Sequence, residues 1–298
     1  MEFENVIYGT NIKKSFKGFD LDVEELRIPK GFATALIGEN GAGKTTLLRI
    51  LAGIWLDYTG KIQYFDEKLE DVESVKERLG YTGPNSFFLP QWTIPQIEKI
   101  SGLLFDNFDS VKYRKLCQEL SISAKGAKKK VNSLSDGNKM KLELAAVFAR
   151  DVDCLLMDEP ASPLDPLMRD TLCGMIHEYI EKGNGEKSVF FSTHNITDME
   201  NVTDYAIIMD NGKIAEQGFV EDLKEKYILV KGETGDVSKA EKYLYSFSAG
   251  SYGFEGLCLA KDLDKLAGLD ISRETPSLFQ ISVAVMKAAG KLRNREGD

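Results

Sequence analysis

The sequence has few of the residues that build zinc sites or disulfide frameworks. Its 298 residues include four cysteines and two histidines. The cysteines form no C-x-x-C pair and are scattered along the chain, at Cys117, Cys154, Cys173 and Cys258. This spacing favours neither kind of site, and we expect free thiols in a reducing, cytoplasmic setting. The stretch His177-Glu178 lacks the second histidine of the H-E-x-x-H motif, so we reject a zinc site there.

Long apolar runs and an excess of positive charge are also missing. No apolar run approaches the ~20 residues of a membrane span, and the N-terminus lacks a signal-peptide pattern. The 47 acidic residues outnumber the 38 basic ones, which gives a net charge of −9. Because nucleic-acid-binding proteins usually carry a basic face, we expect no nucleic-acid partner. If the protein works at a membrane, another chain must supply the spanning helices.

The most informative stretch is a glycine-rich loop, Gly38-Glu39-Asn40-Gly41-Ala42-Gly43-Lys44-Thr45. It has the pattern G-x-x-x-x-G-K-T between an apolar, strand-like run at 33–37 and a helix-like run at 45–52. Such a loop directs backbone N–H groups at phosphate oxygens, and the helix start adds its positive dipole end. Lys44 is predicted to bind the β- and γ-phosphates, and Thr45 to bind Mg²⁺. A chance glycine-rich turn is the alternative, which the flanking strand and helix disfavour.

Two further buried strands are predicted to end in polar side chains. The apolar run at 154–157 leads into Asp158-Glu159, and the run at 188–193 leads into His194. Carboxylates at the end of a buried strand beside a phosphate loop are typical of a magnesium site. One carboxylate for the metal and one for the attacking water is the expected division of roles.

The remaining pattern predicts an α/β fold. Alternating polar and apolar residues over 1–30 predict two or three antiparallel strands. Thr275-Pro276 predicts the start of a last helix. Prolines predict a loop over 83–95. Three aromatic side chains in this loop suggest either a local core or a docking surface: Phe87, Phe88 and Trp92.

The motifs together, in this order, resemble the ATP-binding subunits of ATP-binding cassette (ABC) transporters. Leu134-Ser135-x-Gly137 precedes the Asp158-Glu159 strand and is the specific part, because many NTPases share the phosphate loop. Ser162-Pro163-Leu164-Asp165 and Ser192-Thr193-His194 extend the resemblance, which covers about residues 3–225. It implies a P-loop NTPase core with an antiparallel β subdomain and a helical subdomain.

The resemblance also implies the domain limits and the site. We expect an ABC ATP-binding domain at 1–227, with its helical subdomain at about 88–150, and a small α+β accessory domain at 228–298. The chain would be an ATPase that uses ATP and Mg²⁺. Its nucleotide-binding residues would be Phe16, Gly38, Glu39, Asn40, Gly41, Ala42, Gly43, Lys44, Thr45, Thr46, Ser135 and Gly137.

Individual roles follow from the same resemblance. Phe16 would stack on adenine, Asp158 would orient the magnesium shell with Thr45, and Glu159 would polarise the attacking water. His194 would contact the γ-phosphate, and Lys44 would neutralise charge. The Ser135–Gly137 turn would complete the site of a second copy, because such subunits enclose two ATP molecules head to tail. The 162–165 turn would communicate across that dimer.

Three positions depart from the family pattern. The usual glutamine after the strand near 79–82 is missing, and in Gly83-Pro84-Asn85 only Asn85 could replace it near the metal. Asp136 stands where glycine is usual, so its carboxylate must point away from phosphate or weaken binding. Asn138 replaces the usual glutamine, which is a mild change.

The run from Ser135 to Leu142 looks like the signature of bacterial exporter cassettes of the multidrug and antibiotic type. Such cassettes serve a separate membrane subunit, and Pro276-Ser277-Leu278 fits their C-terminal extension. We therefore expect a subunit at the inner face of the cell membrane that dimerises with itself or a paralogue and drives export through a permease. Alternatives are a soluble ABC ATPase without a transport role and a degenerate partner in a heterodimer. The acidic balance, together with the lack of heptads and zinc cysteines, disfavours the soluble alternative.

Overall fold

The computed structural model describes residues 3–65, 72–84, 87–122 and 129–296. Its centre is a six-stranded sheet with the order β5-β6-β7-β3-β8-β9. All neighbouring strands are parallel except the pair of β8 and β9. The strands are β3 (Ala33–Ile37), β5 (Leu79–Thr82), β6 (Cys154–Asp158), β7 (Ser188–Thr193), β8 (Tyr205–Asp210) and β9 (Lys213–Phe219). Since β3, β6 and β7 are parallel neighbours, the residues that follow them meet at one edge of the sheet.

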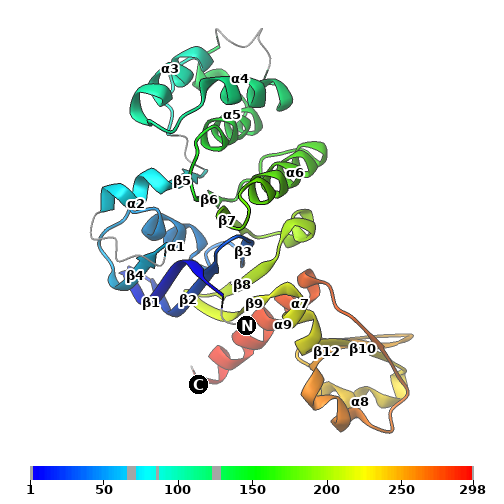
Figure 1. The fold of residues 1–298 in the computed structure, drawn as a ribbon. Helices are drawn as coiled ribbons and strands as arrows, with labels where there is room; N and C mark the ends of the chain where they lie inside the picture. Colours follow the sequence, from blue (N-terminus) through cyan, green and yellow to red (C-terminus); the bar gives the residue numbers. More distant parts are fainter. Residues whose placement is uncertain (1–2, 66–71, 85–86, 123–128, 297–298) are drawn as a thin grey trace.

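A second sheet, antiparallel and three-stranded, covers one side of this core (Figure 1). It consists of β1 (Asn5–Phe16), β2 (Phe19–Pro29) and β4 (Thr59–Tyr64). Helix α1 (Lys44–Leu51) buries Leu47 and Leu48 in one apolar cluster with Ile7 of β1 and Leu156 of β6. The helix therefore packs against both sheets, and the glycine-rich loop before it is held between β3 and this helix.

The helical part of the chain forms a separate lobe above the main sheet in Figure 1. It contains α3 (Ile94–Leu104), α4 (Ser110–Glu119) and α5 (Asp136–Phe148). Short α2 (Val72–Arg78) precedes β5. Helix α6 (Pro166–Lys182) packs against β7, and α7 (Val220–Lys226) packs against β9 and the strand that follows α7. No helix in the described ranges is both long enough and apolar enough to cross a bilayer.

The C-terminal residues build a third, four-stranded antiparallel sheet with the order β11-β12-β10-β13. Its strands are β10 (Tyr227–Gly232), β11 (Phe247–Gly250), β12 (Gly253–Leu259) and β13 (Ile271–Glu274), with short α8 (Val237–Ala240) between β10 and β11. This sheet has an apolar cluster of its own around Val230, Phe254 and Cys258. A boundary near residue 227 remains our proposal for the limit of the accessory domain.

The last helix, α9 (Leu278–Glu296), does not stay with the C-terminal sheet but returns to the main core (Figure 1). Its buried Ile281 and Ala284 share a cluster with Ala206 and Ile208 of β8. The helix begins after the predicted Thr275-Pro276. Ser277 forms the cap instead: its Oγ accepts from Gln280 N at 3.2 Å, and its own N–H donates to Gln280 Oε1 at 2.9 Å.

Because α9 completes the main core, we predict that its buried face contributes to the stability of the whole chain. Ile281→Ala should lower the free energy of unfolding by about 2–5 kcal/mol through lost burial and a cavity. Phe279→Ala, on the same helix but 46% exposed, should cost less than about 1 kcal/mol. Denaturant unfolding of both variants tests this, and equal losses would contradict the assigned packing.

Candidate functional site

The glycine-rich loop runs from the end of β3 to the start of α1, as the sequence pattern predicts. Gly43 has a φ of 106°, and a Cβ atom there would lie 2.8 Å from the ring of Phe19, so a larger residue would not fit. The buried Lys44 donates from Nζ to Gly38 O at 2.7 Å and to Glu39 O at 3.1 Å. The ammonium is therefore folded back over the loop that is expected to hold phosphate.

Asp158 is fully buried at the end of β6. Its Oδ1 accepts a hydrogen bond of 2.6 Å from Ser192 Oγ on the neighbouring strand β7. The other oxygen, Oδ2, is buried and has no hydrogen-bond partner among the described residues. A buried carboxylate oxygen with an unused lone pair is the kind of ligand that Mg²⁺ prefers, so Asp158 fits the expected ion.

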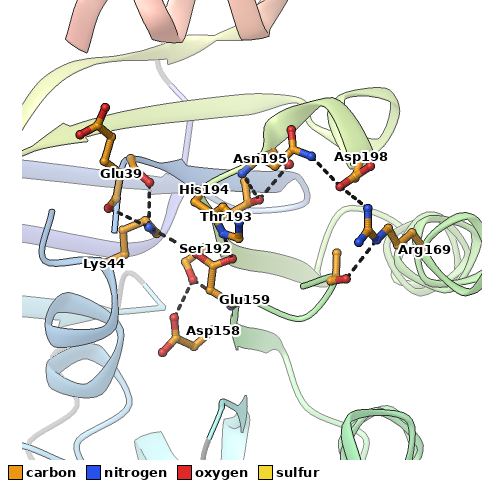
Figure 2. A network of polar contacts seen from close by, with 12 residues as sticks. Glu39, Lys44, Asp158, Glu159, Arg169, Ser192, Thr193, His194, Asn195 and Asp198 are labelled. Carbon is orange, nitrogen blue, oxygen red and sulfur yellow. Dashed lines mark hydrogen bonds and ion pairs between the residues drawn. The ribbon is translucent and has the colours of Figure 1, made fainter. Parts of the chain in front are cut away.

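Glu159 lies between Lys44 and His194 (Figure 2). Its Oε1 is 3.3 Å from Lys44 Nζ, and its Oε2 accepts a 2.8 Å hydrogen bond from His194 Nδ1. The structure thus brings together the three residues that the sequence analysis proposed as catalytic. This constellation combines a cation, a carboxylate and an imidazole, which could neutralise phosphate charge and orient a water molecule.

An open pocket surrounds the phosphate loop. Among its lining residues are Phe16, Gly41, Thr45, Thr46 and Glu159. Ser135 and Gly137 are not among the described residues that line it. One chain therefore lines this pocket with the phosphate loop and the acidic strand end, but not with Ser135 or Gly137.

Trp55, which the sequence analysis missed, lines the aromatic side of this pocket. Phe16, which is 39% exposed, packs its ring against Trp55 with centroids 5.6 Å apart. Lys14 Nζ lies 5.1 Å from the Phe16 ring and 5.3 Å from the Trp55 ring. Trp55 follows α1 without any motif, so only the fold reveals its position beside Phe16.

The Ser135–Gly137 turn begins α5, where Ser135 is the N-cap and its Oγ accepts from Asn138 N at 3.4 Å. A Cβ atom on Gly137 would lie 2.8 Å from Pro163 O, so the turn packs closely on the 162–165 turn of the same chain. The Asp136 carboxylate is 86% exposed and pairs with Lys139 at 2.9 Å. The hydrogen bond from Lys139, together with its charge, holds the pKa of Asp136 below its usual value.

The loop after β5 contributes to a larger cavity of about 800 Å³ that also contains Asp136, Glu159 and His194. Phe87 is 56% exposed in this loop, whereas Phe88 and Trp92 pack partly against the main core. The side chains of this loop therefore contribute both to a local core and to an exposed apolar surface. Asn85, which we expected as a substitute for the missing glutamine, lies outside the described residues.

Arg169 on α6 connects the two turns that flank the site (Figure 2), and the sequence analysis missed it. Its Nε donates to Ala161 O at 3.2 Å and to Leu164 O at 2.9 Å, and its Nη1 donates to Asp198 Oδ2 at 2.7 Å. Asn195, next to His194, also donates to Asp198 Oδ2, at 2.8 Å. A guanidinium fork can make all these bonds in fixed directions, which an ammonium cannot.

We predict that Arg169→Met loosens both turns. The loss of these hydrogen bonds should lower the free energy of unfolding by about 1–3 kcal/mol, because Asp198 keeps its charge without its cation. Lys182→Met removes the exposed pair of Lys182 and Glu178 from the same helix and should change stability little. Chemical denaturation of the two variants decides this, and an Arg169→Met protein as stable as the Lys182→Met control would refute the assigned role.

Known proteins that are similar to this chain identify its family. A family model described as ABC transporter matches residues 21–162. An uncharacterized ABC transporter ATP-binding protein of Synechocystis sp. is 30% identical over 250 residues, which cover 81% of this chain and 69% of that protein. The tungstate uptake system ATP-binding protein TupC of Peptoclostridium acidaminophilum is 30% identical over 212 residues, 70% of this chain and 95% of its own.

Solved structures show the same fold. The ATP-binding subunit of an ABC transporter matches with a TM-score of 0.64 and 22% identity, over 74% of this chain and 92% of its own. The cassette MJ0796, solved as a dimer in a post-hydrolysis state with ADP and Pi, matches with a TM-score of 0.61 and 18% identity, over 72% of this chain and 98% of its own. With its motifs assembled in this fold, the chain belongs to the family of ABC transporter ATP-binding proteins and is an ATPase of the P-loop type.

Proposed function

We propose that this chain is the ATP-hydrolysing subunit of an exporter, and that two cassettes enclose two ATP molecules to drive a separate membrane permease. The observation that carries this proposal is the incomplete pocket around the phosphate loop. Lys44, Thr45 and Glu159 line it, whereas Ser135 and Gly137 of the same chain do not, although Asp136 of their turn lines the neighbouring cavity with Glu159 and His194. A second copy, or a paralogue, would supply that turn.

In this proposal the residues of the site have separate roles in binding ATP and in its hydrolysis. The loop from Gly38 to Thr46 binds the triphosphate, and Phe16 stacks on the adenine. Thr45 and Asp158 hold Mg²⁺, which neutralises phosphate charge. Glu159 orients the attacking water, and His194 positions Glu159 and the γ-phosphate. Closing the dimer would bring the Ser135 hydroxyl and the N–H groups of its turn to the same phosphate.

The permease would dock on an apolar cleft of about 530 Å³ between the main core and the helical lobe. Ile54, Phe87 and Phe105 line the cleft, and the adjacent Leu104 is 68% exposed. Apolar side chains gathered in this way commonly mark interaction sites. Docking there would place the chain at the inner face of the membrane.

The direction of transport rests on two stretches of sequence. The run from Ser135 to Leu142 and the extension with Pro276-Ser277-Leu278 are similar to those of exporter cassettes. Relatives named for uptake, of tungstate in one case and nickel in another, are 30% and 26% identical over 70% of this chain. Transport assays with the permease in inverted vesicles would test the direction: ATP-dependent uptake into inverted vesicles indicates export, and ATP-dependent release contradicts it.

The ATPase roles make a sharp prediction for Glu159→Gln. Without the carboxylate the water loses its orienting base, so turnover should fall at least ~100-fold while ATP still binds. The variant should accumulate as an ATP-bound dimer in size-exclusion chromatography. Lys44→Ala is the control, because it should lose ATP affinity and stay monomeric with ATP. Normal turnover by Glu159→Gln would remove Glu159 from its proposed role.

The alternative of a degenerate partner in a heterodimer depends on Asp136. If the exposed carboxylate stays with Lys139, Asp136→Gly should leave the ATPase rate unchanged or raise it. Steady-state phosphate release measures this rate for the isolated chain. A large loss would show that Asp136 has a positive role, and no activity in either protein would favour the degenerate alternative.

A further inference from the structure

One buried hydroxyl contacts both carboxylate residues of the site, and nothing above gives it a function. In the parallel pairing of β6 and β7, Ser192 lies directly beside Asp158. The Ser192 hydroxyl donates to Asp158 Oδ1 at 2.6 Å and accepts from the backbone N–H of Glu159 at 2.9 Å (Figure 2). The side chain is fully buried, so it is not exchanging these bonds with solvent.

The second of these bonds acts where the backbone is strained. Glu159 has a φ of 53°, a left-handed conformation that non-glycine residues adopt only at a cost. The chain leaves β6 through this residue, and its carbonyl accepts from Ser162 N at 3.2 Å as the turn forms. The Ser192 hydroxyl fixes the N–H on the other side, so both the N–H and the carbonyl of Glu159 are hydrogen-bonded.

We propose that Ser192 is a positioning residue of the ATPase site, which sets the magnesium-binding Asp158 and the water-orienting Glu159 through one hydroxyl. The inference rests on the proposed roles of these two carboxylates. A hydroxyl has one proton to donate and lone pairs to accept with, and both capacities are used here in the required directions. The donated bond leaves Asp158 Oδ2 for the ion, and the accepted bond aims the Glu159 side chain at Lys44 and His194.

The chain supplies a matched control at the other end of the same strand. Ser188 is also fully buried in β7, and its Oγ accepts from the backbone N–H of Gly31 at 2.9 Å. Ser192→Ala and Ser188→Ala therefore each delete one buried hydroxyl that accepts a backbone N–H. Of the two residues, only Ser192 also donates to a carboxylate of the site.

Ser192→Ala should lower kcat about 10–100-fold, the usual effect of removing a group that orients a metal ligand. The Mg²⁺ concentration for half-maximal activity should rise several-fold, whereas KM for ATP should stay within about threefold, because the phosphate loop is untouched. Ser188→Ala should keep both kcat and the Mg²⁺ dependence. A Ser192→Ala enzyme that matches Ser188→Ala in both measurements overturns the inference.

A second pair of variants guards against failure to fold. Ser192→Thr and Ser192→Val have nearly the same shape and differ in the hydroxyl. The threonine variant should retain more activity than the valine variant, and equal activity would also overturn the inference. Failure of the proposed function is distinguishable, because Glu159→Gln would then retain turnover. If Glu159→Gln is inactive and Ser192→Ala is normal, only the role of Ser192 is wrong.

Discussion

The carboxylate of Glu159 is shared between a lysine and a histidine, and the rest of the site is arranged around this contact. Lys44 Nζ lies 3.3 Å from one of its oxygens, and His194 Nδ1 lies 2.8 Å from the other. The three residues follow β3, β6 and β7, which are neighbours in the order β6-β7-β3 of one sheet. Parallel pairing places their ends at one edge, so the sheet order itself assembles the site. The hydrogen bond between Asp158 and Ser192 joins β6 and β7 at this edge, and it links two residues that are paired directly in the register of these strands.

The same architecture underlies our proposal that one chain offers only part of a site. The Ser135–Gly137 turn begins α5 in the helical lobe and packs on the 162–165 turn, and neither Ser135 nor Gly137 lines the pocket of its own phosphate loop. Arg169 joins the 162–165 turn to the segment after His194. A partner that presses on either turn would therefore act on the residues around the γ-phosphate. The helix α9 adds a further constraint, because it ties the C-terminal sheet to β8.

Local signals predicted much of this arrangement, and tertiary contacts determine the rest. The phosphate loop, Asp158-Glu159 and His194 were predictable, because the spacing of the loop motif and the polar residues after apolar runs indicate them directly. Trp55 and Arg169 were not, since their partners lie on other elements and no short pattern marks them. Ser192 belongs to a motif, but only the fold shows its bonds to Asp158 and Glu159. The start of α9 was placed too early because Pro276 is a helix-start signal in its own right, whereas Ser277 and Gln280 form the actual capping box. The roles of the individual site residues remain predictions.

The central claim is that the phosphate loop of one cassette and the serine turn of another form a single site, and mixing two inactive variants tests it most directly. Lys44→Ala disables the loop, and Ser135→Asp keeps an N-cap residue but places a negative charge against phosphate. Each variant alone should be inactive. An equal mixture should regain ATPase activity, up to about a quarter of the wild-type rate at random pairing, because each mixed dimer has one intact site that binds ATP. Activity of the mixture no greater than the sum of the separate variants would contradict the shared site.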